Sequence, residues 1–90
     1  MKTIKIFKAI WCGPCRAIAP MIDQIKTEFT DISFNSIDVD ENPEESIKYG
    51  ITSVPTILFI ENDEVKGSHK GALTKSALKT LIGQNFSLSS

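Results

Sequence analysis

Two cysteines lie three positions apart in the run Trp11-Cys12-Gly13-Pro14-Cys15, and they are the only cysteines in the chain. This run stands where an alternating apolar segment is followed by apolar residues at helical spacing. A helix start favours negative charge through its unpaired N–H groups and its dipole, so it would stabilise the thiolate of Cys12. Cys15 lies one turn further along the helix. The spacing therefore predicts a redox dithiol, with Cys12 as the exposed nucleophile and Cys15 as the shielded resolving thiol.

The two residues between the cysteines suit this geometry. Gly13 and Pro14 allow a tight turn, and a proline in the first helical turn lacks only an N–H that would be unpaired anyway. Half of a zinc site is one alternative, but zinc takes about four ligands and the one histidine, His69, is far away in the sequence. A pair of inert buried thiols is the other. The strand-then-helix context favours redox chemistry over both, so no metal site is expected.

Composition narrows the class of protein. The 90 residues suit one small domain, and 41% hydrophobic residues can build a modest core. A net charge of −1 with scattered Lys and Arg argues against nucleic acid as a partner. No apolar run approaches the roughly 18 residues of a membrane span, and the N-terminal residues lack a signal-peptide core. We expect a single cytoplasmic domain over residues 1–90, monomeric, with residues 86–90 as a loose tail.

Periodicity and turn residues predict seven elements. The expected strands are residues 3–9, 32–39, 56–60 and 65–70, and the expected helices run from 12 to about 28, from Asn42-Pro43 to Gly50, and onward from a cap at Thr74. Asn62-Asp63 suits the turn of a hairpin between the last two strands. The order is βαβα followed by ββα. The first two strands should run parallel through a right-handed crossover, and the last two antiparallel.

With these elements in place, the chain resembles the thioredoxin family. The likeness lies in residues 11–15 with Pro20, in residues 37–43, in residues 49–51 with 54–56, and in residues 71–73. The Cys-Gly-Pro-Cys form separates it from glutaredoxins, which usually carry Pro-Tyr between the cysteines, and from disulfide isomerases, which carry Gly-His. The resemblance implies an α/β thioredoxin fold. Because the family's usual first strand and helix have no counterpart before Thr3, the implied sheet has four mixed strands in the order 2-1-3-4, flanked by helices.

The resemblance also implies roles outside the cysteine run. Pro55 matches the family's cis-proline, whose loop, with Val54, faces the cysteines and pairs with the substrate backbone. Trp11 would flank the site as an exposed aromatic residue, rather than as an ordinary core tryptophan. Gly71 would line the substrate groove, although a plain turn glycine is an equal alternative. His69 matches no catalytic residue of the family and is interpreted as a surface histidine on a strand.

Four positions depart from the family pattern. Two are buried positions in the family, where Ile6 replaces an Asp and Ser36 replaces its partner Lys. The other two are Lys70, at a usually apolar position beside the substrate groove, and Lys8, in place of an aromatic residue three positions before Trp11. These changes leave the cysteine chemistry intact. They bear on how the proton of Cys15 is removed and on which partner proteins are chosen.

The predicted function is therefore the reduction of protein disulfides by the Cys-Gly-Pro-Cys dithiol. Disulfide-containing proteins are the expected partners, and NADPH is the expected electron source through a flavoprotein thioredoxin reductase. No bound cofactor is expected, because the chain has no nucleotide-binding glycine pattern. Two alternatives stay open at this stage: a glutaredoxin-like reductase supplied by glutathione, and a thioredoxin-fold binding subunit of a larger assembly.

Overall fold

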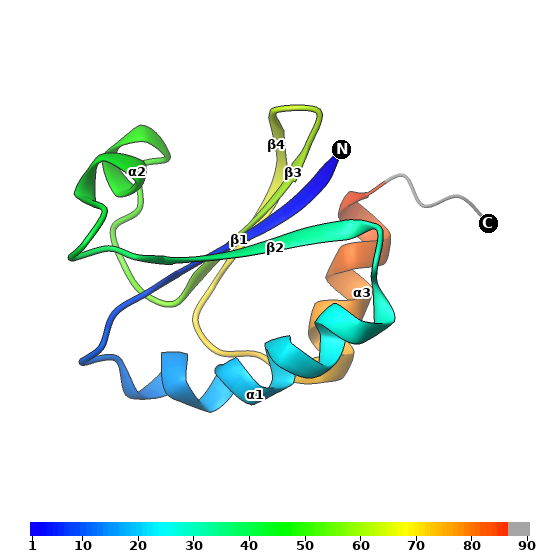
Figure 1. Ribbon diagram of the computed structural model, residues 1–90, viewed down its shortest axis with the longest axis horizontal. Helices are drawn as coiled ribbons and strands as arrows, with labels where there is room; N and C mark the ends of the chain where they lie inside the picture. The colour runs from blue at the N-terminus through cyan, green and yellow to red at the C-terminus, as the bar shows by residue number, and fades with distance from the viewer. Residues whose placement is uncertain (87–90) are drawn as a thin grey trace.

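The computed structural model describes residues 1–86 as a single mixed sheet with helices packed on it (Figure 1). The elements are β1 (Lys2–Lys8), α1 (Gly13–Glu28), β2 (Ile32–Asp38), α2 (Pro43–Lys48), β3 (Thr56–Glu61), β4 (Glu64–Lys70) and α3 (Lys75–Asn85). The strand order is β2-β1-β3-β4, with β1 parallel to β2 and antiparallel to β3, and β3 antiparallel to β4. The predicted fold and strand order are confirmed.

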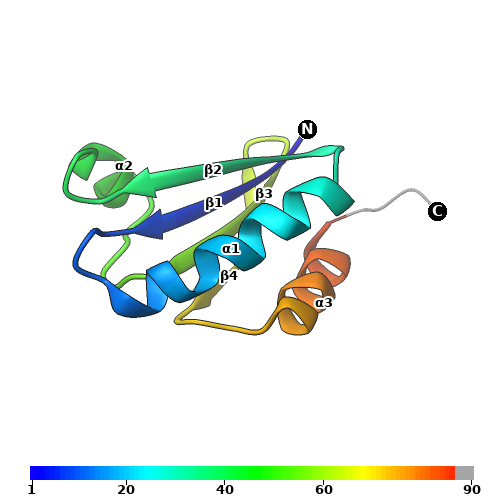
Figure 2. The same cartoon turned by 60° about the horizontal axis from the view of Figure 1, so that its bottom comes forward.

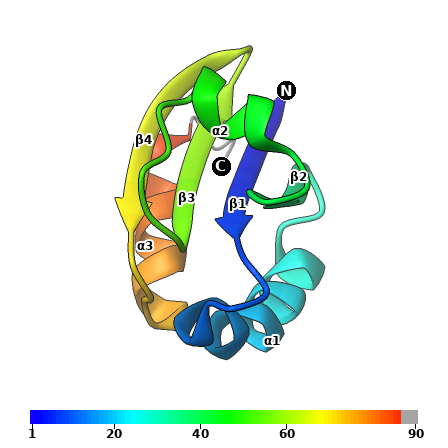
Figure 3. The same cartoon turned by 90° about the vertical axis from the view of Figure 1, so that its left-hand side faces the viewer.

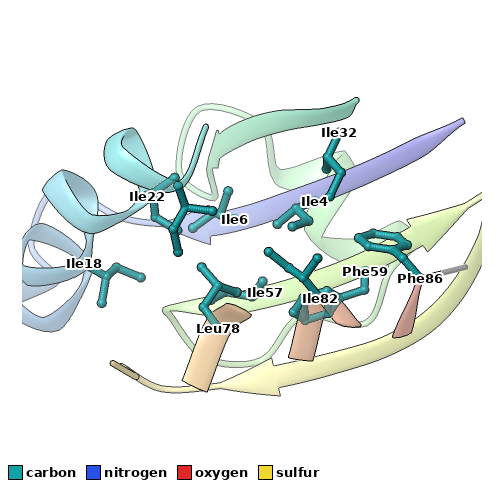
Figure 4. Close-up of a cluster of buried hydrophobic side chains, with 11 residues drawn as sticks. Ile4, Ile6, Ile18, Ile22, Ile32, Ile57, Phe59, Leu78, Ile82 and Phe86 are labelled. Atoms are coloured by element: carbon teal, nitrogen blue, oxygen red, sulfur yellow. The ribbon is translucent and has the colours of Figure 1, made fainter. Parts of the chain in front are cut away.

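Helices cover both faces of the sheet. Figure 2 shows α1 and α3 side by side on one face, and Figure 3 shows α2 on the other. Strand alternation sorts the side chains of β1, since Ile4 and Ile6 belong to the cluster under α1 and α3 whereas Phe7 belongs to the cluster on the α2 side. Figure 4 shows the larger cluster, to which the sheet and both helices contribute: Ile4, Ile6, Ile18, Ile22, Ile25, Ile32, Ile57, Phe59, Leu78, Ile82 and Phe86.

Local signals place the ends of the elements close to where the sequence predicts them. The Thr74 hydroxyl accepts a hydrogen bond of 3.1 Å from the Ala77 amide, as expected of the cap of α3. Asn62 and Asp63 have φ angles of 53° and 67°, the left-handed conformation that a two-residue type I′ hairpin turn requires. Asn42 stands at the N-cap of α2, but its side chain makes no capping hydrogen bond there.

The predicted loose tail is wrong at its first residue. Phe86 is the C-cap residue that follows α3, is buried in the main core, and packs edge-on against Phe59 with the ring centroids 5.9 Å apart. A large aromatic side chain gains about 1.5–3 kcal/mol by such burial, which is enough to order one residue after a helix. The remainder of that predicted tail lies outside the described residues. Within residues 1–86, no helix combines the length and apolarity that crossing a membrane requires.

His69 lies on a strand as predicted, but it is half-buried rather than fully exposed at the surface. His69 pairs with the fully buried Ile57 across β3 and β4, and its Nε2 atom is buried without a hydrogen-bond partner. This position lies on the same side of β4 as Gly67, where an added Cβ would collide with the Asn85 side chain of α3. The imidazole therefore lies on the face of β4 that is turned toward α1 and α3, with its Nε2 atom covered.

An ion-pair cluster joins the end of α1 to α3. The ammonium groups of Lys75 and Lys79 each lie 2.8 Å from the Glu28 carboxylate, and these hydrogen bonds lower the pKa of Glu28 from 4.5 to about 2. Because the pKa is lower in the folded state, the cluster stabilises the fold above about pH 4.5 and loses this effect as the pH falls toward 2.

We therefore expect Glu28→Gln to lower the melting temperature slightly at pH 7 and not at about pH 2. The effect should be small because the carboxylate is solvent-exposed, and added salt should shrink it further. Thermal melts of both proteins across this pH range test the prediction. A difference that is the same at both ends of the range would show that Glu28 acts by packing and not by its charge.

Candidate active site

The two cysteines form a disulfide at the start of α1. Cys12 is the N-cap residue, with extended backbone angles, and Cys15 lies in the first turn at a Cα–Cα separation of 5.3 Å. The Cys12 Sγ atom accepts a hydrogen bond of 3.2 Å from the Cys15 amide, so the sulfur satisfies one of the unpaired donors of the helix start. Pro14, in the first turn, has no amide to leave unpaired. The dithiol geometry predicted from the run of residues 11–15 is thus present in its oxidised form.

Exposure does not distinguish the two cysteines. Cys12 is 4% exposed and Cys15 is 6% exposed, so Cys12 is not the exposed thiol that the sequence predicts. Both cysteines cluster with Ala9, and the half-buried side chains of Val39 and Val54 pack against this cluster. Val39 and Val54 come from segments far away in the sequence, which is why residues 11–15 alone could not indicate this burial. The difference between the two sulfurs lies instead in the position of Cys12 at the helix start.

The loop before β3 lies against the disulfide, as the resemblance implies. The peptide bond between Val54 and Pro55 is cis, Pro55 is fully buried, and Val54 contacts the cysteine cluster. The loop is held from both sides, because the Thr56 hydroxyl donates to the Ser53 carbonyl at 2.7 Å and the Gly71 amide donates to the Pro55 carbonyl at 2.8 Å. These contacts place the backbone of residues 53–55 beside the disulfide.

Gly71 needs to be glycine for a backbone reason. Its φ of +91° is a conformation that side chains with a Cβ rarely adopt, whereas the space around its missing side chain is open to 4 Å. The backbone turn alone therefore explains why residue 71 is a glycine. A part in contacting substrate stays a prediction, which its hydrogen bond to the loop of Pro55 makes geometrically reasonable.

Trp11 is an exposed aromatic residue, and its orientation is fixed by a partner that sequence reasoning missed. The indole ring is 68% exposed, and its Nε1 donates a hydrogen bond of 2.9 Å to the Asp40 carboxylate. Asp40 is positioned in turn by Asp38, whose carboxylate accepts hydrogen bonds from the amides of Asp40 and Glu41 at 2.8 and 3.2 Å. Asp40 belongs to the acidic run around the end of β2, but it lies 29 residues from Trp11. No local pattern therefore indicates that the two side chains are paired.

A largely apolar groove of about 280 Å³ lies beside Trp11. It runs between α2 and the loop of Pro55, and Ile47 on α2 is 80% exposed at its edge. Exposed large apolar side chains beside a reactive group are typical of a surface that contacts another protein. The groove is lined by Trp11, Val39, Pro43, Ser46, Ile47, Ile51, Thr52, Ser53 and Val54.

The two positions of the missing charged pair differ in burial. Ile6 is 4% exposed and belongs to the main core, but Ser36 is exposed, so only one of the two positions is buried as predicted. Their Cα atoms are paired across β1 and β2. Because β2 is an edge strand, the side chain of Ser36 faces solvent at this point of the fold. Within residues 1–86, no group of three or more His, Cys, Asp or Glu side chains could hold a metal ion.

A four-stranded mixed sheet with a disulfide at a helix start, a cis-proline loop against it and an exposed tryptophan beside it defines a class of thiol–disulfide domains. Comparison with known proteins agrees with this class. The family model described as Thioredoxin matches residues 2–84, and the chain belongs to the thioredoxin family.

Two sequence relatives and one solved structure support the same family. The chain is 41% identical over 81 residues to thioredoxin of Bacillus subtilis, covering 89% of this chain and 78% of that protein. It is 48% identical over 77 residues to the chloroplastic M-type thioredoxin of Pisum sativum, covering 84% of this chain and 45% of that one. It thus spans less than half the length of this plant relative. The X-ray structure of Fasciola hepatica thioredoxin superposes with a TM-score of 0.88 at 34% identity, covering 94% of this chain and 81% of that chain.

Proposed function

We propose that this protein is a thiol–disulfide oxidoreductase that reduces disulfide bonds in other proteins. The observation that carries the proposal is the Cys12–Cys15 disulfide at the start of α1, beside the exposed Trp11 and the apolar groove. A disulfide there can be reduced to a dithiol, and the groove offers a partner protein an apolar surface next to it. The family relatives named thioredoxin support the same activity.

The reaction proceeds in two exchanges. The Cys12 thiolate attacks one sulfur of the target disulfide, forming a Cys12–target bond and releasing the other target sulfur as a thiolate. The Cys15 thiol then loses its proton and attacks the Cys12 sulfur, which forms the Cys12–Cys15 disulfide and releases the second target thiolate. Both target thiolates take protons from solvent. The target gains two electrons and the dithiol loses two, so the protein must be reduced again before the next turnover.

Each remaining site residue has a part in this scheme. The backbone of Val54 and Pro55 pairs with the extended target chain next to its disulfide, and the side-chain-free Gly71 leaves room beside it. Trp11 covers the edge of the groove, and Asp40 holds its ring in place. Gly13 and Pro14 keep the turn between the cysteines short.

We propose NADPH as the electron source, delivered by a thioredoxin reductase, and the cytoplasm as the compartment. A protein that reduces disulfides needs a reducing compartment to regenerate its dithiol. Some relatives are named as chloroplastic, so fractionation of the source cells is the direct test of location.

A reduction assay on a generic protein disulfide tests the function and the donor together. We expect turnover with NADPH and a thioredoxin reductase, and only background turnover with glutathione, NADPH and glutathione reductase. Turnover with glutathione alone would contradict the donor and favour a glutaredoxin-like reductase. Absence of turnover with both, together with partner binding that survives Cys12→Ser, would instead indicate a binding subunit.

A further inference from the structure

A second route leads to Cys15 from the side of the molecule opposite the groove. Two hollows, of about 270 and 210 Å³, lie against α1 near the ends of β1 and β2. Cys15, Lys8 and Ala19 line both hollows, whereas Cys12 lines neither. Figure 2 shows the reason for the location, since the first turns of α1 and the carboxyl ends of β1 and β2 meet at one end of the molecule.

The residues that create the hollows are small or point outward. Ala19 leaves space on the face of α1, and Ser36 on the edge strand does not fill the volume beside Ile6. The lining is also charged, since Arg16 and Asp38 line the larger hollow and Asp23 lines the smaller one. A water molecule occupies about 30 Å³ of liquid, so hollows of this size and polarity can hold several.

These hollows matter for the second exchange, in which Cys15 must lose a proton while the target is still attached to Cys12. The bound target covers the groove side, where Val39 and Val54 already bury the sulfurs. No carboxylate stands at the buried position of Ile6 to take the proton. Water in the hollows behind Cys15 is then the acceptor that the bound target leaves accessible.

We propose that the proton of Cys15 leaves to solvent through these hollows, and that Lys8 is the residue whose positive charge stabilises the Cys15 thiolate formed there. Lys8 lines both hollows together with Cys15 and ends β1, directly before the loop that leads to the cysteines. The proton passes from sulfur to water, and the thiolate then attacks Cys12 as described above. The other charged groups facing the hollows are Arg16 with the same sign, and Asp23 and Asp38 with the opposite sign. This inference rests on the proposed disulfide-reductase function.

The direct test is titration of the Cys15 thiolate by its ultraviolet absorbance in Cys12→Ser, with and without Lys8→Met. Loss of the Lys8 charge is expected to raise the titration midpoint so that the thiolate population near pH 7 falls about three- to tenfold. Lys8→Arg should restore the original midpoint, because it restores the charge. Lys66→Met is the matched control, since it removes the same charge at the opposite end of the sheet, where β4 leaves the hairpin.

Single-turnover reduction of a disulfide peptide between about pH 6 and pH 9 tests the same role in the reaction. The resolution step of Lys8→Met should be slower by the same factor at neutral pH and should equal the wild-type rate at high pH. Asp23→Asn removes a carboxylate that lines the smaller hollow and has no part in positioning Trp11, and it should leave the resolution step as fast as, or faster than, in the unmodified protein.

Two results would overturn the inference. The first is an unchanged thiolate midpoint in Lys8→Met. The second is slower resolution in Asp23→Asn, because a carboxylate would then be taking the proton. A wild-type protein that fails to reduce the peptide contradicts the proposed function instead, and the thiolate titration still decides the role of Lys8 in that case.

Discussion

Cys15→Ser is expected to accumulate a covalent complex with target proteins, and Cys12→Ser is expected to accumulate none. Only the sulfur at the N-cap of α1 can form the first bond to the target, and without Cys15 nothing releases that target. Both variants should lose turnover down to the uncatalysed rate. The complexes can be counted on non-reducing gels after incubation with a disulfide-containing protein, with the reducing gel as control.

Alkylation of the reduced wild-type protein is a second test of whether Cys12 is the nucleophile and Cys15 the resolving thiol. Because both cysteines are nearly equally buried in the disulfide form, exposure predicts similar rates, whereas the helix start predicts a faster reaction at Cys12 near neutral pH. Mass spectrometry of the modified peptides separates the two sites. Equal rates at Cys12 and Cys15, or complexes trapped by Cys12→Ser, would contradict the roles proposed for the two thiols.

Ile6→Asp is expected to lower the free energy of unfolding by about 3–5 kcal/mol at pH 7. The side chain of Ile6 is packed in the main core, so the substitution removes apolar contacts and also buries a carboxylate. The neighbouring strand position, Ser36, offers that carboxylate no positive charge. Urea unfolding of the two proteins measures the difference.

The pH dependence of this variant separates the charge from the lost packing. Burial raises the pKa of a carboxyl group, so the folded variant binds its proton more readily than the unfolded chain does. The deficit should therefore shrink as the pH falls from 7 through the raised pKa toward about 4. Ile6→Asn is the matched control, because it has a similar shape without the charge and should show the same deficit at both pH values. A deficit in Ile6→Asp that does not change with pH would mean that the carboxylate reaches the hollow and stays solvated.

The sequence by itself determined the features that depend on neighbours within a few positions. The helix start at Cys12, the cap at Thr74 and the hairpin turn at Asn62-Asp63 each follow from short-range hydrogen bonds or backbone preferences. The order of the elements predicted a parallel first pair of strands and an antiparallel last pair, whereas the full strand order came from the resemblance to the thioredoxin family. The redox chemistry was likewise predictable from the cysteine spacing, because a disulfide across one helical turn needs only local geometry.

Tertiary structure decided every feature in which segments far apart in the sequence share a surface. Burial of the two cysteines depends on Val39 and Val54, and the orientation of Trp11 depends on Asp40, 29 residues away. Likewise, the burial of Phe86 depends on Phe59 and the rest of the main core, which come from other segments. The hollows behind Cys15 exist because an edge strand and a helix face fail to fill the space between them. Burial and empty volume are properties of packed surfaces, and no pattern along a single segment specifies what packs against it.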